Sequence, residues 1–480
     1  MRSRLPLVLA VLLLPCTPGH ASAAPAFSPI VKAFVAIDDP VVAVENVRVI
    51  DGTGSAPRER QTAIFAGGTI AAIGAAAATA VPANAKRVDG NGMTLLPGYV
   101  GTHNHLYYVS GRAPDGFFIA REMPTSFPRL YLAAGVTTMR TTGSQEPFTD
   151  LNLKRAIDAG KAAGPSIDVT APYITGPTDT FLQMDVLKDA DDARRTVAFW
   201  ADRGATSFKA YTDITHAELA AAIDEAHKRG LKVAGHLCSI GFREAAELGI
   251  DSLEHGLFVD TELDPQKQPD RCPSTASARA ALERTPVDGP AIRATIAALV
   301  QHHVAISSTL AIFESFGQRP LSARTLAMLD GESLADVTAS HARAMAAPRD
   351  DYEPLLKKEM AFERAFARAG GLLTTGPDPT GFGGVIAGFG DQRGIELLVE
   401  AGFTPVEAIR IATRNGAQLL GRLDSIGTLE RGKHADAILI KGNPAANIAD
   451  IENVVYTFKD GVAYDSGKLI ESVRGLAGRR

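Results

Sequence analysis

The spacing of hydrophobic positions changes twice along the chain. Between residues 41 and 96, short apolar runs alternate with polar residues and are separated by turns rich in Gly, Asn and Asp. This pattern is typical of a small antiparallel sheet. From residue 97 onward the apolar runs are short and rich in β-formers, and helical stretches lie between them. Such alternation predicts parallel β-α-β units.

Eight apolar runs fit the strands of these units. They are residues 99–105, 136–143, 166–174, 206–213, 232–238, 250–255, 304–310 and 371–378. Amphipathic stretches such as 191–204 and 215–230 lie between them, and each ends at a glycine that can cap a helix. Eight β-then-α units favour a closed (β/α)8 barrel over residues 97–423, because an open sheet of that size would be unusual.

The β pattern returns after the last predicted helix, residues 404–421, in residues 434–444 and 451–465. Because both flanks of the barrel have the pattern of strands, we predict that residues 41–96 and 424–470 form one β-sandwich domain. The predicted fold class is therefore α/β: a TIM-like barrel with a small β-sandwich built from both ends of the chain.

The first residues form a segment of a different kind. Two arginines precede the apolar run 5–14, and Ala21 and Ala23 stand as in an A-x-A cleavage site. We therefore predict a signal peptide over residues 1–23 and a secreted or periplasmic mature protein. The apolar run is about half the length of a membrane span. We expect no membrane association after cleavage.

Composition adds limits on the partners. The 480 residues are 45% hydrophobic and 21% charged, and the formal net charge is −5. Without a basic patch, nucleic acid is a poor partner, and we expect a small-molecule substrate. Cys238 and Cys272 remain after signal cleavage. They can form a disulfide in an oxidising compartment or stay reduced, because a chain this long does not need the bond to fold. A homo-oligomer also stays open.

Four histidines stand at the ends of predicted strands. His103 and His105 end the first strand and, being two residues apart, point to the same face. His236 and His255 end the fifth and sixth strands. A lone His-x-His is equally consistent with ordinary hydrogen-bonded histidines. Four imidazoles at the mouth of a barrel would be costly to bury without a cation, which favours a metal site.

Two charged residues complete the candidate site. Asp378 ends the eighth strand, next to the first, where its carboxylate can bind metal and accept a proton from bound water. A turn rich in Pro and Gly also favours Asp without any ligand. Lys209 ends the fourth strand. A plain ammonium would repel divalent cations, so Lys209 is either paired in an ordinary salt bridge or converted to a carbamate, N6-carboxylysine, that bridges two metals.

Together with the segments "PGYVGTHNH" and "IGTLERGKHADAILIKGNP", these residues resemble the metal-dependent amidohydrolase superfamily. The likeness is to its binuclear branch, related to imidazolonepropionase and to prolidase-like dipeptidases of the Xaa-Pro or Xaa-Arg type. It implies that His103 and His105 bind one divalent ion and that the other histidine pair binds a second. Carboxylated Lys209 would bridge the two ions, and Asp378 would complete the first site. Imidazole ligands favour zinc, while manganese, iron, cobalt and nickel stay open.

The resemblance implies a hydrolase that cleaves carbon–nitrogen bonds. A metal-bound hydroxide would attack the carbonyl, and Asp378 would pass a proton to the leaving nitrogen. The loops 106–118 and 376–390 offer aromatic, apolar and glycine surface that suits a small ligand with an apolar part.

We expect a dipeptide or an N-acyl amino acid as substrate. Arg112 could clamp its carboxylate and Tyr211 could orient its carbonyl, although solvent exposure and core packing are the commoner fates of these residue types. Two alternatives stay open. One is a lactonase or phosphoester hydrolase on the same site, and the other is a non-catalytic protein that binds metal or a small molecule.

Overall fold

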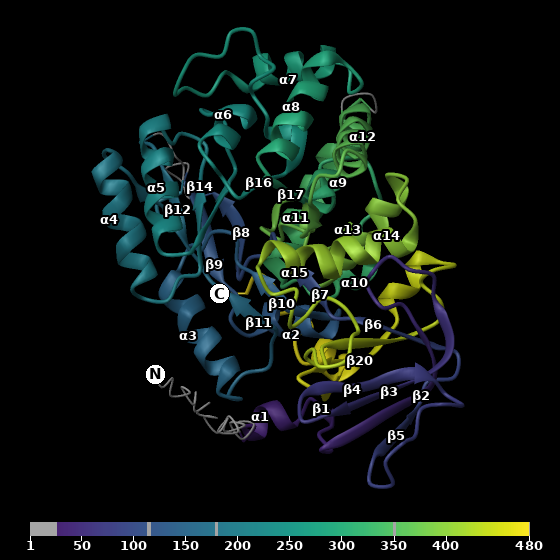
Figure 1. Cartoon of the computed structure of the whole chain (residues 1–480). Helices are drawn as coiled ribbons and strands as arrows, with labels where there is room; N and C mark the ends of the chain where they lie inside the picture. Colours follow the sequence, from purple (N-terminus) through teal and green to yellow (C-terminus); the bar gives the residue numbers. More distant parts are fainter. Residues whose placement is uncertain (1–25, 113–116, 178–180, 349–351, 480) are drawn as a thin grey trace, which may run out of the picture.

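The computed structural model describes residues 26–112, 117–177, 181–348 and 352–479 (Figure 1). The predicted signal peptide lies outside these residues. Within the described part of the chain, no helix has the length and apolar character needed to cross a membrane.

One nine-stranded sheet is formed from both ends of the chain. Its strands are β1 (Val35–Ile37), β2 (Val41–Val49), β3 (Arg58–Ala66), β4 (Thr69–Ala75), β5 (Lys86–Asp89), β6 (Met93–Pro97), β19 (Ala437–Lys441), β20 (Val454–Lys459) and β21 (Val462–Asp465). The two ends meet in the antiparallel pair β6–β19, where Leu95 lies opposite Leu439. Apolar side chains of this sheet, among them Val44, Phe65 and Phe458, pack into a core of their own.

Parallel strands occupy the middle of the chain in two further sheets. The smaller contains β7 (Tyr99–Gly101), β10 (Val136–Arg140) and β11 (Ser166–Asp168), and the larger contains β12 (Thr170–Thr175), β13 (Asp185–Val186), β14 (Ser207–Ala210), β15 (Lys232–Gly235), β16 (Ser252–Glu254), β17 (Ala305–Ser308) and β18 (Leu373–Thr375). All eight apolar runs picked out in the sequence contain one of these strands. The predicted α/β class is confirmed.

Backbone hydrogen bonds connect the two parallel sheets on both sides. The Thr102 amide donates to the Thr375 carbonyl, which links the end of β7 to β18. The Ser144 amide donates to the Ala171 carbonyl, which links the segment after β10 to β12. The carboxyl ends of the parallel strands therefore open toward one common region.

Helices lie between the parallel strands in the chain, before the first of them and after the last. The longer ones are α2 (Ser126–Ala133), α3 (Pro147–Asp158), α4 (Ala190–Ala201), α5 (His216–Lys228), α7 (Thr275–Arg284), α8 (Pro290–Gln301), α11 (Gly331–Ala346), α12 (Glu353–Arg368) and α13 (Phe389–Glu400). Shorter ones are α1 (Pro29–Lys32), α6 (Phe242–Glu247), α9 (Leu310–Ser315), α10 (Ala323–Leu326), α14 (Pro405–Arg410), α15 (Gly416–Leu419) and α16 (Ser466–Glu471). The predicted helices 191–204 and 215–230 correspond to α4 and α5. Thr215 and Glu218 form a capping box at the start of α5, which satisfies its first free amides.

The segment after His105 differs from the prediction. Residues 106–118 were expected as a loop, yet β8 (Tyr107–Arg112) pairs with β9 (Phe118–Glu122) in an antiparallel hairpin. The aromatic and aliphatic residues of this segment, which the sequence analysis assigned to a ligand-binding loop, therefore belong to paired strands.

A disulfide joins Cys238, just after β15, to Cys272, just before α7. It ties the segment that follows His236 to the long connection after β16.

Candidate active site

The six predicted metal-site residues line one cavity of about 200 Å³. They are His103, His105, Lys209, His236, His255 and Asp378. The first two follow β7, Lys209 lies in β14, and the other three follow β15, β16 and β18. These positions are distant in the sequence, and they converge because the carboxyl ends of parallel strands face the same region.

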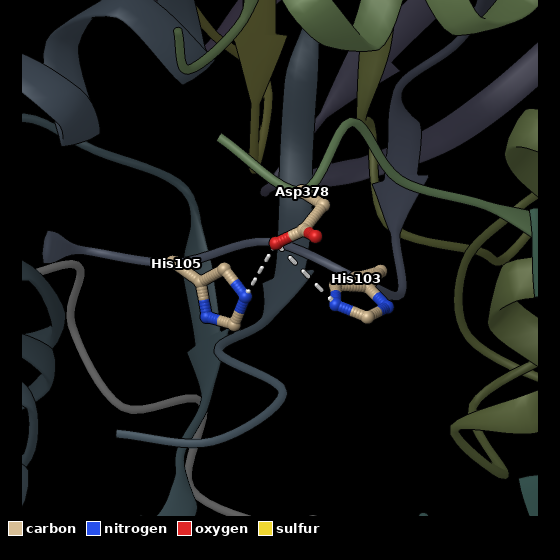
Figure 2. A group of neighbouring side chains, drawn as sticks. All are labelled: His103, His105 and Asp378. Carbon is tan, nitrogen blue, oxygen red and sulfur yellow. Dashed lines mark ion pairs between the residues drawn. The ribbon is translucent and has the colours of Figure 1, made fainter. Parts of the chain in front are cut away.

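His103, His105 and Asp378 form the tightest group (Figure 2). One oxygen of Asp378, Oδ1, lies 3.0 Å from Nε2 of His105 and 3.6 Å from Nε2 of His103. One donor atom from each of the three residues falls within 4.8 Å of the others. Such a group of two imidazoles and a carboxylate can hold a divalent metal ion.

The other three residues adjoin this group. The Lys209 Nζ lies 3.2 Å from Nε2 of His103. The ring centres of His236 and His255 are 4.4 Å apart, and that of His255 is 4.5 Å from that of His103. The second pair of histidines therefore lies beside the first.

Outer contacts orient the first two imidazoles. The Nδ1 of His105 lies 2.9 Å from the Thr141 carbonyl oxygen, and the Nδ1 of His103 lies 2.6 Å from an oxygen of Glu254. Both partners are acceptors, so each Nδ1 carries the proton and donates it. The lone pair of each Nε2 then faces Asp378, where a metal would bind.

Glu254 and Arg140 belong to the site although neither was predicted. Glu254 is fully buried and accepts from Arg140 Nη2 at 2.9 Å as well as from His103. The Nε of Arg140 donates at 2.9 Å to the carbonyl of Thr102, the residue before His103. The pair therefore braces His103 through its ring and its backbone. The sequence did offer one signal for these residues, because each is a charged residue within a predicted strand.

Burial and neighbouring charges set the protonation states. Burial lowers the pKa of Lys209 to about 8 and is the main cause that lowers the pKa of His103 to about 4 and that of His236 to about 3. Burial would raise the pKa of Asp378, but His103, His105 and Lys209 outweigh it and hold that pKa well below its usual range. At neutral pH His103 and His236 are therefore neutral and Asp378 is ionised, the forms that bind metal.

Two of the candidate ligands have unusual backbone conformations. His255 has a φ of 70° and Asp378 a φ of 53°, in the left-handed region that non-glycine residues rarely adopt. After His255, the backbone amides of Leu257 and Phe258 donate to the buried carboxylate of Glu359 on α12. Strained residues persist where surrounding contacts hold them, and they are concentrated at functional sites.

The other residues singled out in the sequence differ in where they lie relative to the cavity. Tyr211 lines the cavity, and its ring centre lies 4.8 Å from that of His236. Arg112 is in β8, and its side chain falls outside the described part of the chain. Between the two first histidines, Asn104 points away from the cavity and donates to Asp391 of α13 at 2.8 Å. Among the cavity residues not predicted is Tyr107, whose hydroxyl lies 2.6 Å from that of Tyr173.

The α/β fold thus places a His-His-Asp group that could hold a divalent metal ion at the ends of its parallel strands. Residues 94–464 match the Amidohydrolase family, so the chain belongs to this family. It is a hydrolase that acts on carbon–nitrogen bonds. No protein with a curated description matches the chain significantly.

Several solved structures share the fold. A Xaa-Pro dipeptidase with bound methionine in the active site is 22% identical, with a TM-score of 0.66 over 88% of this chain and 100% of that chain. A bottromycin amidohydrolase is 20% identical, with a TM-score of 0.68 over 95% and 98%. Ochratoxinase from A. niger is 18% identical, with a TM-score of 0.62 over 92% and 100%. The predicted membership of the amidohydrolase superfamily is confirmed by the family match, and at these identities the similarity to the solved structures shows a shared fold alone.

Proposed function

We propose that this protein is an exported amidohydrolase with two divalent metal ions that cleaves an amide bond of a small substrate. The observation that carries the proposal is the convergence of four histidines, Lys209 and Asp378 on one cavity. Dipeptides and N-acyl amino acids are the substrates expected from the sequence. We further propose that the two parallel sheets close into a (β/α)8 barrel and that the nine-stranded sheet folds into the predicted sandwich.

The residues fit divalent metal ions. Imidazole nitrogens and a carboxylate oxygen are the donors that zinc prefers, and the lowered pKa values of His103 and His236 keep both rings neutral and able to bind. The Lys209 amine, with a pKa of about 8, is neutral in a larger fraction of molecules than an exposed lysine. A neutral amine adds to carbon dioxide with loss of a proton. The resulting carbamate is an anion that could bridge two cations.

The residues have distinct roles in hydrolysis. Bound metal ions would supply a water of lowered pKa and would polarise the scissile carbonyl. Asp378 is ionised, lies against both first histidines, and can accept a proton and deliver it to the leaving nitrogen. Glu254 and the Thr141 carbonyl hold the two imidazoles in place. Tyr211 lies where it can orient a substrate carbonyl.

Metal analysis combined with a substrate panel tests this function. We expect about two transition-metal ions per chain, and we expect His103→Ala and His236→Ala to lower metal content and amide hydrolysis together. Full activity in excess chelator, with no metal bound, would refute the proposal. Faster turnover of lactones or phosphoesters than of any amide would assign the same site to ester chemistry.

Export is supported by two features. The apolar run 5–14 is followed by an Ala-x-Ala site, and the bond between Cys238 and Cys272 suits an oxidising compartment. We propose that the mature chain begins near Ala24. N-terminal sequencing of the protein from its native host checks this, and an intact Met1 would contradict it.

A further inference from the structure

Aromatic side chains form much of the cavity wall next to the metal-site residues. Phe181 and Phe382 line the cavity on one part of the wall. Phe118 packs against both, stacked on Phe181 at 5.1 Å between ring centres and edge-on to Phe382 at 5.1 Å. This part of the wall offers a flat apolar surface to a bound group.

A second aromatic group comes from α9 and the segment after His255. Phe313 lines the cavity and stacks on Phe258 with ring centres 4.0 Å apart. Phe316, which is 44% exposed, lines the cavity as well. These rings and their neighbours Val259 and Ile312 give the cavity two apolar surfaces, supplied by different elements.

In the described part of the chain, formal charges on the cavity lining are confined to the metal site. Among the described lining residues, Lys209 and Asp378 are the only ones from the classes of lysine, arginine, aspartate and glutamate. Lys209 lies within the metal-site group, where its Nζ is 3.2 Å from Nε2 of His103. A carboxylate buried against the aromatic walls, away from the metal site, would lose its hydration without gaining a cation from the described lining.

Gln145 gives this lining a neutral polar group. It is 2% exposed, lines the cavity, and comes from the segment after β10. The Tyr107 hydroxyl is close to it, and within the described residues neither the nitrogen nor the oxygen of the Gln145 amide has a hydrogen bond of full geometry. A buried amide without partners is costly, and its adjacent donor and acceptor complement an uncharged carbonyl or amide.

We propose that this cavity selects uncharged amides that carry a large apolar group against the aromatic walls, and that Gln145 binds a neutral polar group of the substrate. The inference rests on the proposed amide hydrolysis and narrows it. Neutral amides should be better substrates than the dipeptides and N-acyl amino acids expected from the sequence, since both of the latter carry a carboxylate.

Three probes with the same phenethyl group separate these cases. N-acetyl-phenethylamine is neutral, N-acetyl-phenylalanine adds a carboxylate, and alanyl-phenylalanine is a zwitterionic dipeptide. We expect kcat/KM for the neutral probe to exceed that of the other two by at least about tenfold, as an unpaired buried carboxylate requires. Equilibrium binding of the same probes to the Asp378→Asn variant should follow the same order.

Two variants test the residues involved. Gln145→Met keeps the side-chain size and should raise KM for the neutral probe about fivefold, with kcat and metal content unchanged, because it removes a contact made equally in the ground and transition states. Phe316→Arg places a cation at the half-exposed edge of the cavity. It should reduce the ratio of kcat/KM for the neutral probe to that for N-acetyl-phenylalanine about fivefold. Ile30→Arg is the matched control, since Ile30 is 60% exposed on α1 and does not line the cavity.

The outcomes separate this inference from the proposed function. Equal or faster turnover of either carboxylate probe overturns the preference for uncharged amides and leaves amide hydrolysis standing. An unchanged KM in Gln145→Met overturns the role of Gln145. No turnover of any probe by protein that holds its metal refutes the proposed hydrolysis, and with it the inference.

Discussion

Replacing Arg140 with methionine should destabilise the protein and loosen His103. Glu254 is 0% exposed, and burial alone would raise its pKa. Arg140 is the largest of the causes that instead lower this pKa from 4.5 to about 2. A difference of that size corresponds to about 3 kcal/mol of folding free energy. Because the substitution leaves a buried carboxylate without its main partner, we expect a loss of about 3–5 kcal/mol at neutral pH.

The pH dependence of this loss has a definite sign. The pKa of Glu254 is depressed in the folded chain, so its stabilising contribution is fully present above about pH 4.5 and is lost as the pH falls toward 2. In Arg140→Met the pKa of Glu254 rises. The difference between wild type and variant in the free energy of unfolding should therefore be largest above the raised pKa of Glu254 in the variant and should shrink as the pH falls from that value toward 2.

Urea unfolding monitored by the fluorescence of Trp200, the single tryptophan, measures this difference. Metal content should fall in the variant, since Arg140 also holds the Thr102 carbonyl before His103. The double variant Arg140→Met/Glu254→Gln removes both charges and should recover part of the stability.

The matched control is Arg194→Met, which removes an arginine whose side chain is 40% exposed and paired with Asp224. We expect it to cost less than about 1 kcal/mol. If Arg140→Met costs no more than this control, the argument from the buried pair is wrong.

The remaining predictions concern the metal site. Asp378→Asn should keep the fold and most of the metal, because an amide oxygen can coordinate, while kcat falls by about 10² to 10⁴. Steady-state rates on an activated and an unactivated amide check this, and equal losses on both would remove the leaving-group role. Lys209→Ala should lose metal and rate, and short carboxylic acids should partly restore both; normal metal content would rule out the carbamate.

The parallel strands could be predicted because each is a short apolar run between helical stretches. The candidate ligands were visible for a related reason. Four of them lie within three residues of the end of a strand: His103 after β7, His236 after β15, His255 after β16 and Asp378 after β18. A residue at the end of a parallel strand lies at the common face whatever the loops do. Its residue type and its position in the sequence were therefore enough to propose it for the site.

Residues whose role depends on a partner from another element could not be identified in the same way. Arg140 and Glu254 lie in different strands, and nothing in the spacing of either shows that their side chains meet. The proposed role of Gln145 likewise depends on the residues that surround it in the cavity, which the sequence does not show. The β8–β9 hairpin was missed because its cross-strand pairing depends on β9, which the apolar pattern did not distinguish from a loop.

The alternation of side chains along "THNH" explains how one short segment serves two layers of the fold. His103 and His105 face the cavity, and Asn104 between them faces outward to Asp391, whose other oxygen accepts from the Gly388 amide at the start of α13. The metal-site backbone is thereby attached to the helix that follows the Asp378 loop. His105 and Asp378 are 3.0 Å apart, and the hydrogen bond from Asn104 to Asp391 connects the segment of His105 to the helix that follows Asp378. Asn104 therefore acts as a positioning residue: it holds the backbone between the two histidines from outside the cavity and does not line the cavity itself.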